Sequence, residues 1–314
     1  MPAIVRFDFS RGPAGAPGST GRARSQTGTV PRRRILVAGA AATLFVVSLG
    51  ACAPSLSSFH TAAVPPKGHF AAAFGMEASI PTGSLMSAID AGKTVGKKAT
   101  SDQSLTSEEK WQVFDAGMQL LLNPPSFFSY HLSLAYVPIE RLEVSLRYAG
   151  PALRLASRYQ LLDRATGPFD MSAGLGISCF TYTIPFSDVI PVLKMDDFTR
   201  WQLDVPLLIG MQNRWFRAWT GPRFVATFFD MNMHLDLVVE EPVLASMSGT
   251  AYYIGGQGGL GFGYRWLFVA FELTITRILG SARFDAPAIT DAPTRTVDLS
   301  GLVIYPSFGL MGEF

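Results

Sequence analysis

The stretch Arg141-Leu142-Glu143-Val144-Ser145-Leu146-Arg147-Tyr148 alternates strictly between polar and apolar side chains. Successive side chains of a β-strand point to opposite faces, so a period of two predicts a strand with one charged face and one apolar face. The rest of the chain decides what kind of sheet this strand belongs to.

The same alternation recurs along most of the chain, for example over 153–161 and 201–209. In a membrane the backbone must satisfy its own hydrogen bonds, and a closed sheet with apolar side chains outward does so. The predicted fold class is therefore all-β, an antiparallel transmembrane β-barrel of about ten strands. The expected strands lie near residues 68–79, 129–138, 141–150, 152–162, 168–183, 199–212, 215–230, 250–265, 267–280 and 300–313.

The connections between these segments alternate in length, as in bacterial barrels with long outer loops and short inner turns. The predicted inner turns are all short: 138–141, 162–167, 213–215 and 265–266. The predicted outer loops are 80–128, 149–152, 184–198, 231–249 and 281–299, of which only the second is short. The final strand ends in the aromatic residue Phe314, which resembles the C-terminal signal of outer-membrane barrels.

The first outer loop also contains a predicted short helix. Ser107 to Trp111 supply an acidic start, and Phe114, Met118 and Leu121 follow at helical spacing. We expect this helix to cover the barrel mouth or to present a surface to a partner.

The N-terminal part carries an export signal. Arg32, Arg33 and Arg34 precede an apolar run over 35–49, which is shorter than the roughly 20 residues of a membrane-spanning helix. Leu49-Gly50-Ala51-Cys52 resembles the lipobox of bacterial lipoproteins, which implies acylation of Cys52 as the first mature residue. An ordinary signal peptide with an incidental Cys, or a signal anchor, is the alternative.

These features predict four parts. Residues 1–31 are a disordered or mis-annotated extension, 32–51 the lipoprotein signal peptide, 52–67 a polar tether and 68–314 the barrel. The order from lipobox to terminal Phe resembles β-barrel lipoproteins predicted in myxobacterial genomes, which brings no established activity. From the export signal and the barrel pattern we expect an outer-membrane location with a periplasmic N-terminus. The expected partners are outer-membrane lipid, the barrel-assembly machinery and the lipoprotein-export machinery.

Composition excludes several classes of function. Of the 314 residues 48% are hydrophobic and 16% charged, and the formal net charge is only +2, so we expect no nucleic-acid partner. Once Cys52 is acylated, Cys179 is the one cysteine of the mature chain, so we predict neither a disulfide nor a cysteine metal site. No cofactor and no metal are predicted.

Many charged residues fall on the inward face by parity, where opposite charges can fill a narrow interior as ion pairs. The predicted interior network is Glu77, Glu143, Arg147, Arg154, Arg158, Arg200, Asp204, Arg217, Arg223 and Glu272. His69, His131 and Glu313 also face inward by parity.

The sequence therefore favours a structural or surface-binding barrel that is not an enzyme. A narrow small-solute channel lined by arginine is the first alternative. A membrane-embedded hydrolase is the second, although no Gly-x-Ser-x-Gly motif is present and His131 is expected to lie far from a nucleophile. A soluble β-sandwich or lipocalin-like barrel would instead bury the Leu and Phe rows and expose the Arg rows.

Overall fold

The computed structural model describes residues 55–314 except 102, 104–105, 151, 166, 181–192, 236–242 and 287–293. Within this part of the chain the strands are β1 (Phe70–Pro81), β2 (Ser126–Ile139), β3 (Leu142–Ala149), β4 (Ala152–Leu162), β5 (Asp170–Phe180), β6 (Leu193–Gln212), β7 (Phe216–Leu235), β8 (Val243–Tyr264), β9 (Leu267–Asp285), β10 (Thr294–Asp298) and β11 (Gly301–Glu313). Two helices, α2 (Thr82–Thr100) and α3 (Ser107–Leu122), separate β1 from β2.

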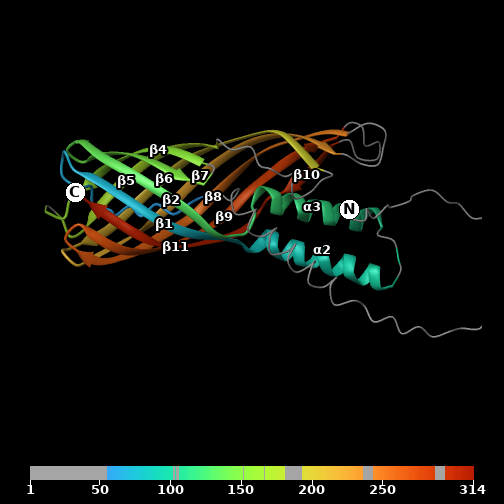
Figure 1. The fold of residues 1–314 in the computed structure, drawn as a ribbon, viewed down its shortest axis with the longest axis horizontal. Helices are drawn as coiled ribbons and strands as arrows, with labels where there is room; N and C mark the ends of the chain where they lie inside the picture. The colour runs from blue at the N-terminus through green and yellow to red at the C-terminus, as the bar shows by residue number, and fades with distance from the viewer. Residues whose placement is uncertain are drawn as a thin grey trace, which may run out of the picture. The chain divides into compact units, whose positions relative to one another are not determined.

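The described strands form one closed antiparallel sheet. Each pairs with its neighbours in the order β10-β9-β11-β1-β2-β3-β4-β5-β6-β7-β8, and the pairing of β8 with β9 closes the ring. β10 and β11 pair with successive stretches of β9, so together they fill one position in the wall. The described chain thus forms a barrel of ten strand positions, which confirms the predicted fold class (Figure 1).

One difference from the prediction is the length of the strands from β6 to β9. They have 20, 20, 22 and 19 residues, whereas β3 has eight, so parts of the expected loops 231–249 and 281–299 are strand. The reason is a change of polarity along each strand. On β7 the outward side chains change from Phe224 and Phe228 to Asn232, while Met231 and Met233 face inward and are buried. The extension is therefore a sheet with a water-facing outer side and an apolar inner side.

The helices lie at the end of the barrel opposite to the C-terminus (Figure 1). α3 coincides with the predicted helix and begins with a capping box, in which Thr106 Oγ1 accepts from the Glu109 backbone N–H and the Glu109 carboxylate accepts from that of Thr106. α2 was not predicted, and it has no side-chain cap. Neither helix is long and apolar enough to cross a membrane.

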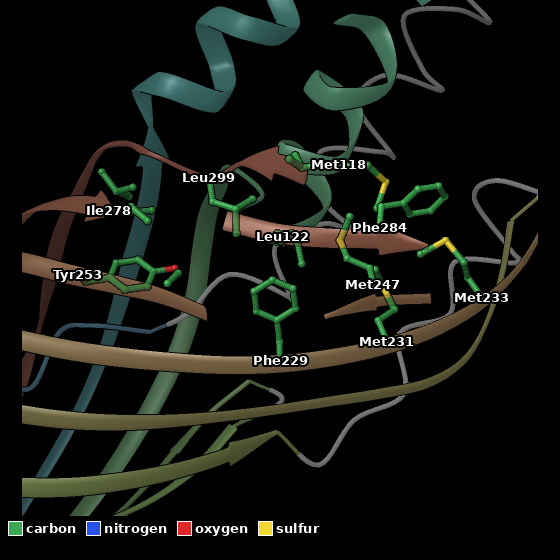
Figure 2. Close-up of a cluster of buried hydrophobic side chains, with 14 of the residues drawn as sticks. Met118, Leu122, Phe229, Met231, Met233, Met247, Tyr253, Ile278, Phe284 and Leu299 are labelled. Atoms are coloured by element: carbon green, nitrogen blue, oxygen red, sulfur yellow. The ribbon is translucent and has the colours of Figure 1, made fainter. Parts of the chain in front are cut away.

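The apolar side of the extended strands packs on α3. Met118 and Leu122 of α3 lie against side chains from β7, β8 and β9, among them several methionines (Figure 2). The cluster drawn there includes Phe229, Met231, Met233, Met247, Tyr253, Ile278, Phe284 and Leu299. This core holds α3 over the helix-bearing end of the barrel.

Candidate functional site: the occupied lumen

The wall of the barrel has an apolar outer side. Leu146 is 48% exposed and Phe271 is 55% exposed, whereas their neighbours Arg147 and Glu272 are 4% and 3% exposed. The alternative of a soluble sheet with exposed Arg rows is therefore wrong, because the large apolar side chains are the exposed ones. Rows of exposed Leu, Val, Ile and Phe around a closed ring are the arrangement that a hydrocarbon environment requires.

Aromatic side chains mark both ends of this apolar wall. At the end with the turns, Trp215 stacks on Tyr264 with ring centroids 4.3 Å apart, and Trp266 lies 5.9 Å from Phe314. At the other end exposed aromatic rings include Tyr130, Tyr148, Trp201 and Tyr252. Aromatic girdles at both interfaces are typical of membrane barrels.

All ten side chains of the predicted interior network are buried, with exposed fractions of 8% or less. Asp204 bridges two arginines, with Oδ2 2.5 Å from both Arg154 and Arg223. Glu143 pairs with Arg158 at 2.7 Å. These ion pairs account for only part of the interactions of the ten residues.

The other partners come from the segment 55–67, which was predicted to be a tether. Residues 56–64 are buried apart from the partly buried His60, and they lie inside the barrel. The prediction of a tether is wrong for these residues, because their backbone is bound by side chains of the inner wall.

We call residues 55–64 the lumenal segment. Inner carboxylates accept hydrogen bonds from its backbone N–H groups. Glu272 accepts from Ser58 at 2.7 Å and from Phe59 at 3.0 Å, and Glu77 accepts from Ser57 at 2.9 Å. The carboxylates thus satisfy backbone donors that would otherwise be buried without a partner.

Arginines satisfy the acceptors of the same segment. Arg223 donates to the carbonyl oxygen of Leu56, and Arg158 donates to that of Thr61. Arg147 donates to the hydroxyl of Ser55 and, at 3.2 Å, to that of Ser57. Further along, the amide oxygen of Gln160 accepts from the Val64 N–H at 2.9 Å. A buried main chain without secondary structure is stable here because charged side chains supply the hydrogen bonds that a neighbouring strand would otherwise make.

Apolar contacts fix the segment as well. The ring of Phe59 stacks on His131 with centroids 5.1 Å apart and lies in a buried cluster with Trp219. Gly75 admits this ring, because a Cβ at that position would lie 2.3 Å from it. Gly259 similarly admits Trp219, whose Nε1 donates to Glu272 at 3.1 Å.

Little space remains beside the segment. A cavity of about 20 Å³ lies between the segment and the wall, lined by His60, Glu143, Arg158 and Arg217 among others. That volume accommodates about one water molecule, which needs roughly 10–15 Å³. At this depth the lumen is filled.

Two predicted network residues bind groups outside the lumenal segment. Arg200 donates to the Leu122 carbonyl and to the Tyr253 hydroxyl, both at 3.3 Å, so it holds the end of α3. Arg217 pairs with Glu313, with one contact at 2.9 Å, and its guanidinium lies 3.8 Å from the Phe268 ring centroid. The structure therefore divides the predicted network among three places.

The structure also brings together a Ser and a His, which the sequence analysis did not expect. Ser57 Oγ lies 3.2 Å from His131 Nδ1. Both residues are buried, and His131 Nε2 has no partner among the described residues, whereas a catalytic His is oriented by a third group. The contact joins Ser57 of the lumenal segment to His131 of β2.

Several predicted features lie outside the described residues. These are the lipidation site Cys52, the lipobox residues Leu49, Gly50 and Ala51, and the basic residues before them. Among the described residues, no group of three or more His, Cys, Asp or Glu side chains is arranged to hold a metal ion.

A comparison of the sequence with protein-family models and with curated proteins finds no match. Solved structures with a similar fold include the outer membrane protein OprG of Pseudomonas aeruginosa, at 13% identity and a TM-score of 0.36, covering 79% of this chain and 97% of that one. The N-terminal β-barrel domain of OprF from the same organism has 9% identity and a TM-score of 0.24, with coverages of 80% and 100%. The Ail attachment invasion locus protein of Yersinia pestis has 8% identity and a TM-score of 0.22, with coverages of 79% and 99%.

Proposed function

We propose that this protein is a lipid-anchored outer-membrane β-barrel whose lumen is closed by its own residues 55–64. Its role is structural or surface-binding, and it neither conducts solutes nor catalyses a reaction. The observation that carries this proposal is the occupation of the lumen by a segment that is hydrogen-bonded on several sides.

The charges of the wall favour a closed barrel rather than a pore. A selective channel needs charged groups that remain free to meet a passing ion. Here Glu77, Glu272, Arg158 and Arg223 are all engaged with the backbone of the lumenal segment. Their charges stabilise the segment in place.

The helix-bearing end supplies the surface for a binding role. It combines the extended parts of β6 to β9 with α2 and α3, and its outer side carries polar residues such as Asp230, Asn232 and Ser248. Lipid anchoring is supported by the sequence around Cys52. Recognition on long outer segments held by a rigid barrel is common in proteins of this architecture.

Conductance in planar bilayers tests the closed lumen. We expect the full chain to insert without conducting, and a variant lacking residues 55–64 to give discrete conductance steps. If the deletion prevents folding, Phe59→Ala replaces it, with Met86→Ala on the exposed side of α2 as the matched control. Stable conductance by the unchanged protein would contradict the proposal and favour the narrow channel.

Two further measurements test insertion and anchoring. A folded membrane barrel migrates faster on a gel before boiling than after it, so we expect this shift for the membrane-extracted protein. Metabolic labelling with a fatty-acid analogue should mark the unchanged protein and not Cys52→Ala. A soluble, unlabelled protein would contradict the proposal.

A further inference from the structure

The chain enters the barrel at the rim formed by the turns β2–β3, β4–β5, β6–β7 and β8–β9. Gly68 donates to the Val137 carbonyl at 2.9 Å, and Phe70 exchanges backbone hydrogen bonds with Phe314. Trp266, in the turn between β8 and β9, accepts from the Glu313 N–H at the same rim. The chain therefore enters the lumen from the end where the turns and the C-terminus lie.

From this rim the segment rises through the barrel as the residue number falls. Val64 is bound by Gln160, close to the turn-side end of β4, and Thr61 by Arg158, one step further along the same strand face. Ser58 and Phe59 are bound by Glu272, which lies further from the turn. Each residue along the strands adds about 2.5 Å of height in a barrel with ordinary tilt. The contacts thus follow one ascending path.

The path ends at the opposite rim. Leu56 packs in the apolar cluster that contains Met118 and Leu122 of α3. Ser55 is bound by Arg147, which lies close to the last residue of β3, Ala149. Because β3 and β4 end far below the extended strands, the wall is low beside Ser55. Ser55 is itself only partly buried, unlike residues 56–59, which are buried.

A return path through the lumen is not available to the preceding residues. A second stretch of chain would need the cross-section that the segment already fills, and the cavity beside it has only about 20 Å³. It would also have to displace the ion pairs of Glu143 and Arg158. The shortest exit from the lumen is over the helix-bearing rim where β3 ends and β4 begins.

We propose that the barrel threads its own N-terminal part, so that the residues before Ser55 leave at the helix-bearing end, opposite to the turns β2–β3, β4–β5, β6–β7 and β8–β9. With these four turns in the periplasm, the mature N-terminus faces the outside of the cell. This inference rests on the proposed membrane barrel but not on lipidation. It replaces the expectation of a periplasmic N-terminus.

The position of Ser55 also limits where a group on Cys52 can reach. Three residues extend over at most about 11 Å. If Cys52 carries an acyl group, threading places that group at the helix-bearing end of the barrel.

An epitope inserted between Pro54 and Ser55 tests the threading in intact cells. Matched insertions after Gln103, between the helices, and after Gly167, in a turn, mark the two sides of the membrane. We expect the tags at 54 and 103 to bind antibody without permeabilisation and the tag at 167 to bind only after it. Retention of the heat shift shows that each tagged barrel has folded.

The outcomes separate the two proposals. A tag at 54 that requires permeabilisation, with both controls as expected, overturns threading and leaves the barrel in place. Controls that do not differ overturn the oriented membrane barrel and the threading with it.

An added thiol tests the threading where the epitope at 54 abolishes the heat shift. In a Cys179→Ser background, which retains Cys52, Ser55→Cys should bind one more membrane-impermeant maleimide in intact cells than the background does, whereas Ala165→Cys in the turn should bind no more than the background. An unreactive Ser55→Cys, in a protein that reacts after permeabilisation, contradicts the proposal. A free thiol at Cys52 would report the same end of the barrel.

Discussion

Arg223 donates to the main-chain oxygen of Leu56, which precedes it by 167 positions, while its Nε donates to Asp204 at 3.0 Å. One guanidinium thus joins the wall of the barrel to the segment inside it. In Arg223→Met, Asp204 keeps only Arg154 and the Leu56 carbonyl loses its donor. Removing one partner of a buried charge pair costs about 3–5 kcal/mol, so we expect the free energy of unfolding to fall by that amount.

Urea unfolding in detergent, followed by the gel shift, measures this effect. Arg283→Met is the matched control, because the Arg283 side chain is 66% exposed and pairs with the nearby Asp285. We expect a change below about 1 kcal/mol there, as for other exposed ion pairs. Equal losses in the two variants would show that the position of Arg223 in the lumen is unimportant.

Glu272→Gln tests the binding of the segment without changing the size of the side chain. The carboxylate accepts from the N–H groups of Ser58 and Phe59 and from Trp219 Nε1. An amide has one acceptor oxygen and brings an NH₂ group that finds a donor where it needs an acceptor. We expect a loss of about 1–3 kcal/mol in stability, the cost of unsatisfied buried groups.

The same variant should loosen the lumenal segment. Amide hydrogen exchange of residues 55–64 should accelerate in Glu272→Gln relative to the unchanged protein, because two of the segment's backbone donors lose a charged acceptor. Glu140→Gln, on an exposed turn residue, is the control. Unchanged protection of the segment would contradict its dependence on Glu272.

The start of α3 should depend on pH. The backbone N–H of Thr106 donates to the Glu109 carboxylate and lowers its pKa below the ordinary value. A depressed carboxylate pKa contributes stability that is present above the unfolded-state pKa and is lost as the pH falls through the folded-state pKa. Exchange protection at residues 106–110, corrected for the intrinsic rate, should therefore decrease in acid. Glu109→Gln should remove this dependence, and a steep dependence that survives the substitution would argue against the capping box as its source.

The wall of the barrel could be predicted from sequence because the alternation of polar and apolar side chains is visible within each strand. A period of two, such as that of Arg141 to Tyr148, fixes which side chains face inward, and every predicted network residue is in fact buried. The extension of β7 was missed because its polarity inverts. Met231 and Met233 continue the same parity as Arg223, but the apolar side now faces inward, and the outward row no longer resembles a membrane strand.

The lumenal segment could not be predicted in this way. Residues 55–64 have no period of two or of 3.6, and their partners lie 20 to 214 positions away. Two signals were nevertheless present. The segment consists largely of small or hydroxylated residues and has no Asp, Glu, Lys or Arg, which suits a narrow charged lumen. The arginines of the predicted network, moreover, outnumber its carboxylates by six to four, so pairing within the network could not satisfy all of them.

Gly75 offers the sharpest test of how the segment is seated. A Cβ added at Gly75 would lie 2.3 Å from the Phe59 ring and 2.7 Å from His131, and both contacts are with side chains of the site. Gly75→Ala should therefore push Phe59 out of its place and cost about 1–3 kcal/mol, the range for overpacking a core. Gly92→Ala in α2 has open space at its Cβ and should instead stabilise by about 1 kcal/mol or less.

The double variant Gly75→Ala/Phe59→Ala then separates steric conflict from general damage. If the added methyl acts on the Phe59 ring, removing that ring should relieve part of the cost, with a coupling of about 0.5–3 kcal/mol between the two substitutions. Relief should be incomplete because His131 also lies within reach of the new Cβ. Strictly additive losses of stability in the urea series would mean that Phe59 does not occupy the space above Gly75. They would contradict the position of the lumenal segment described above.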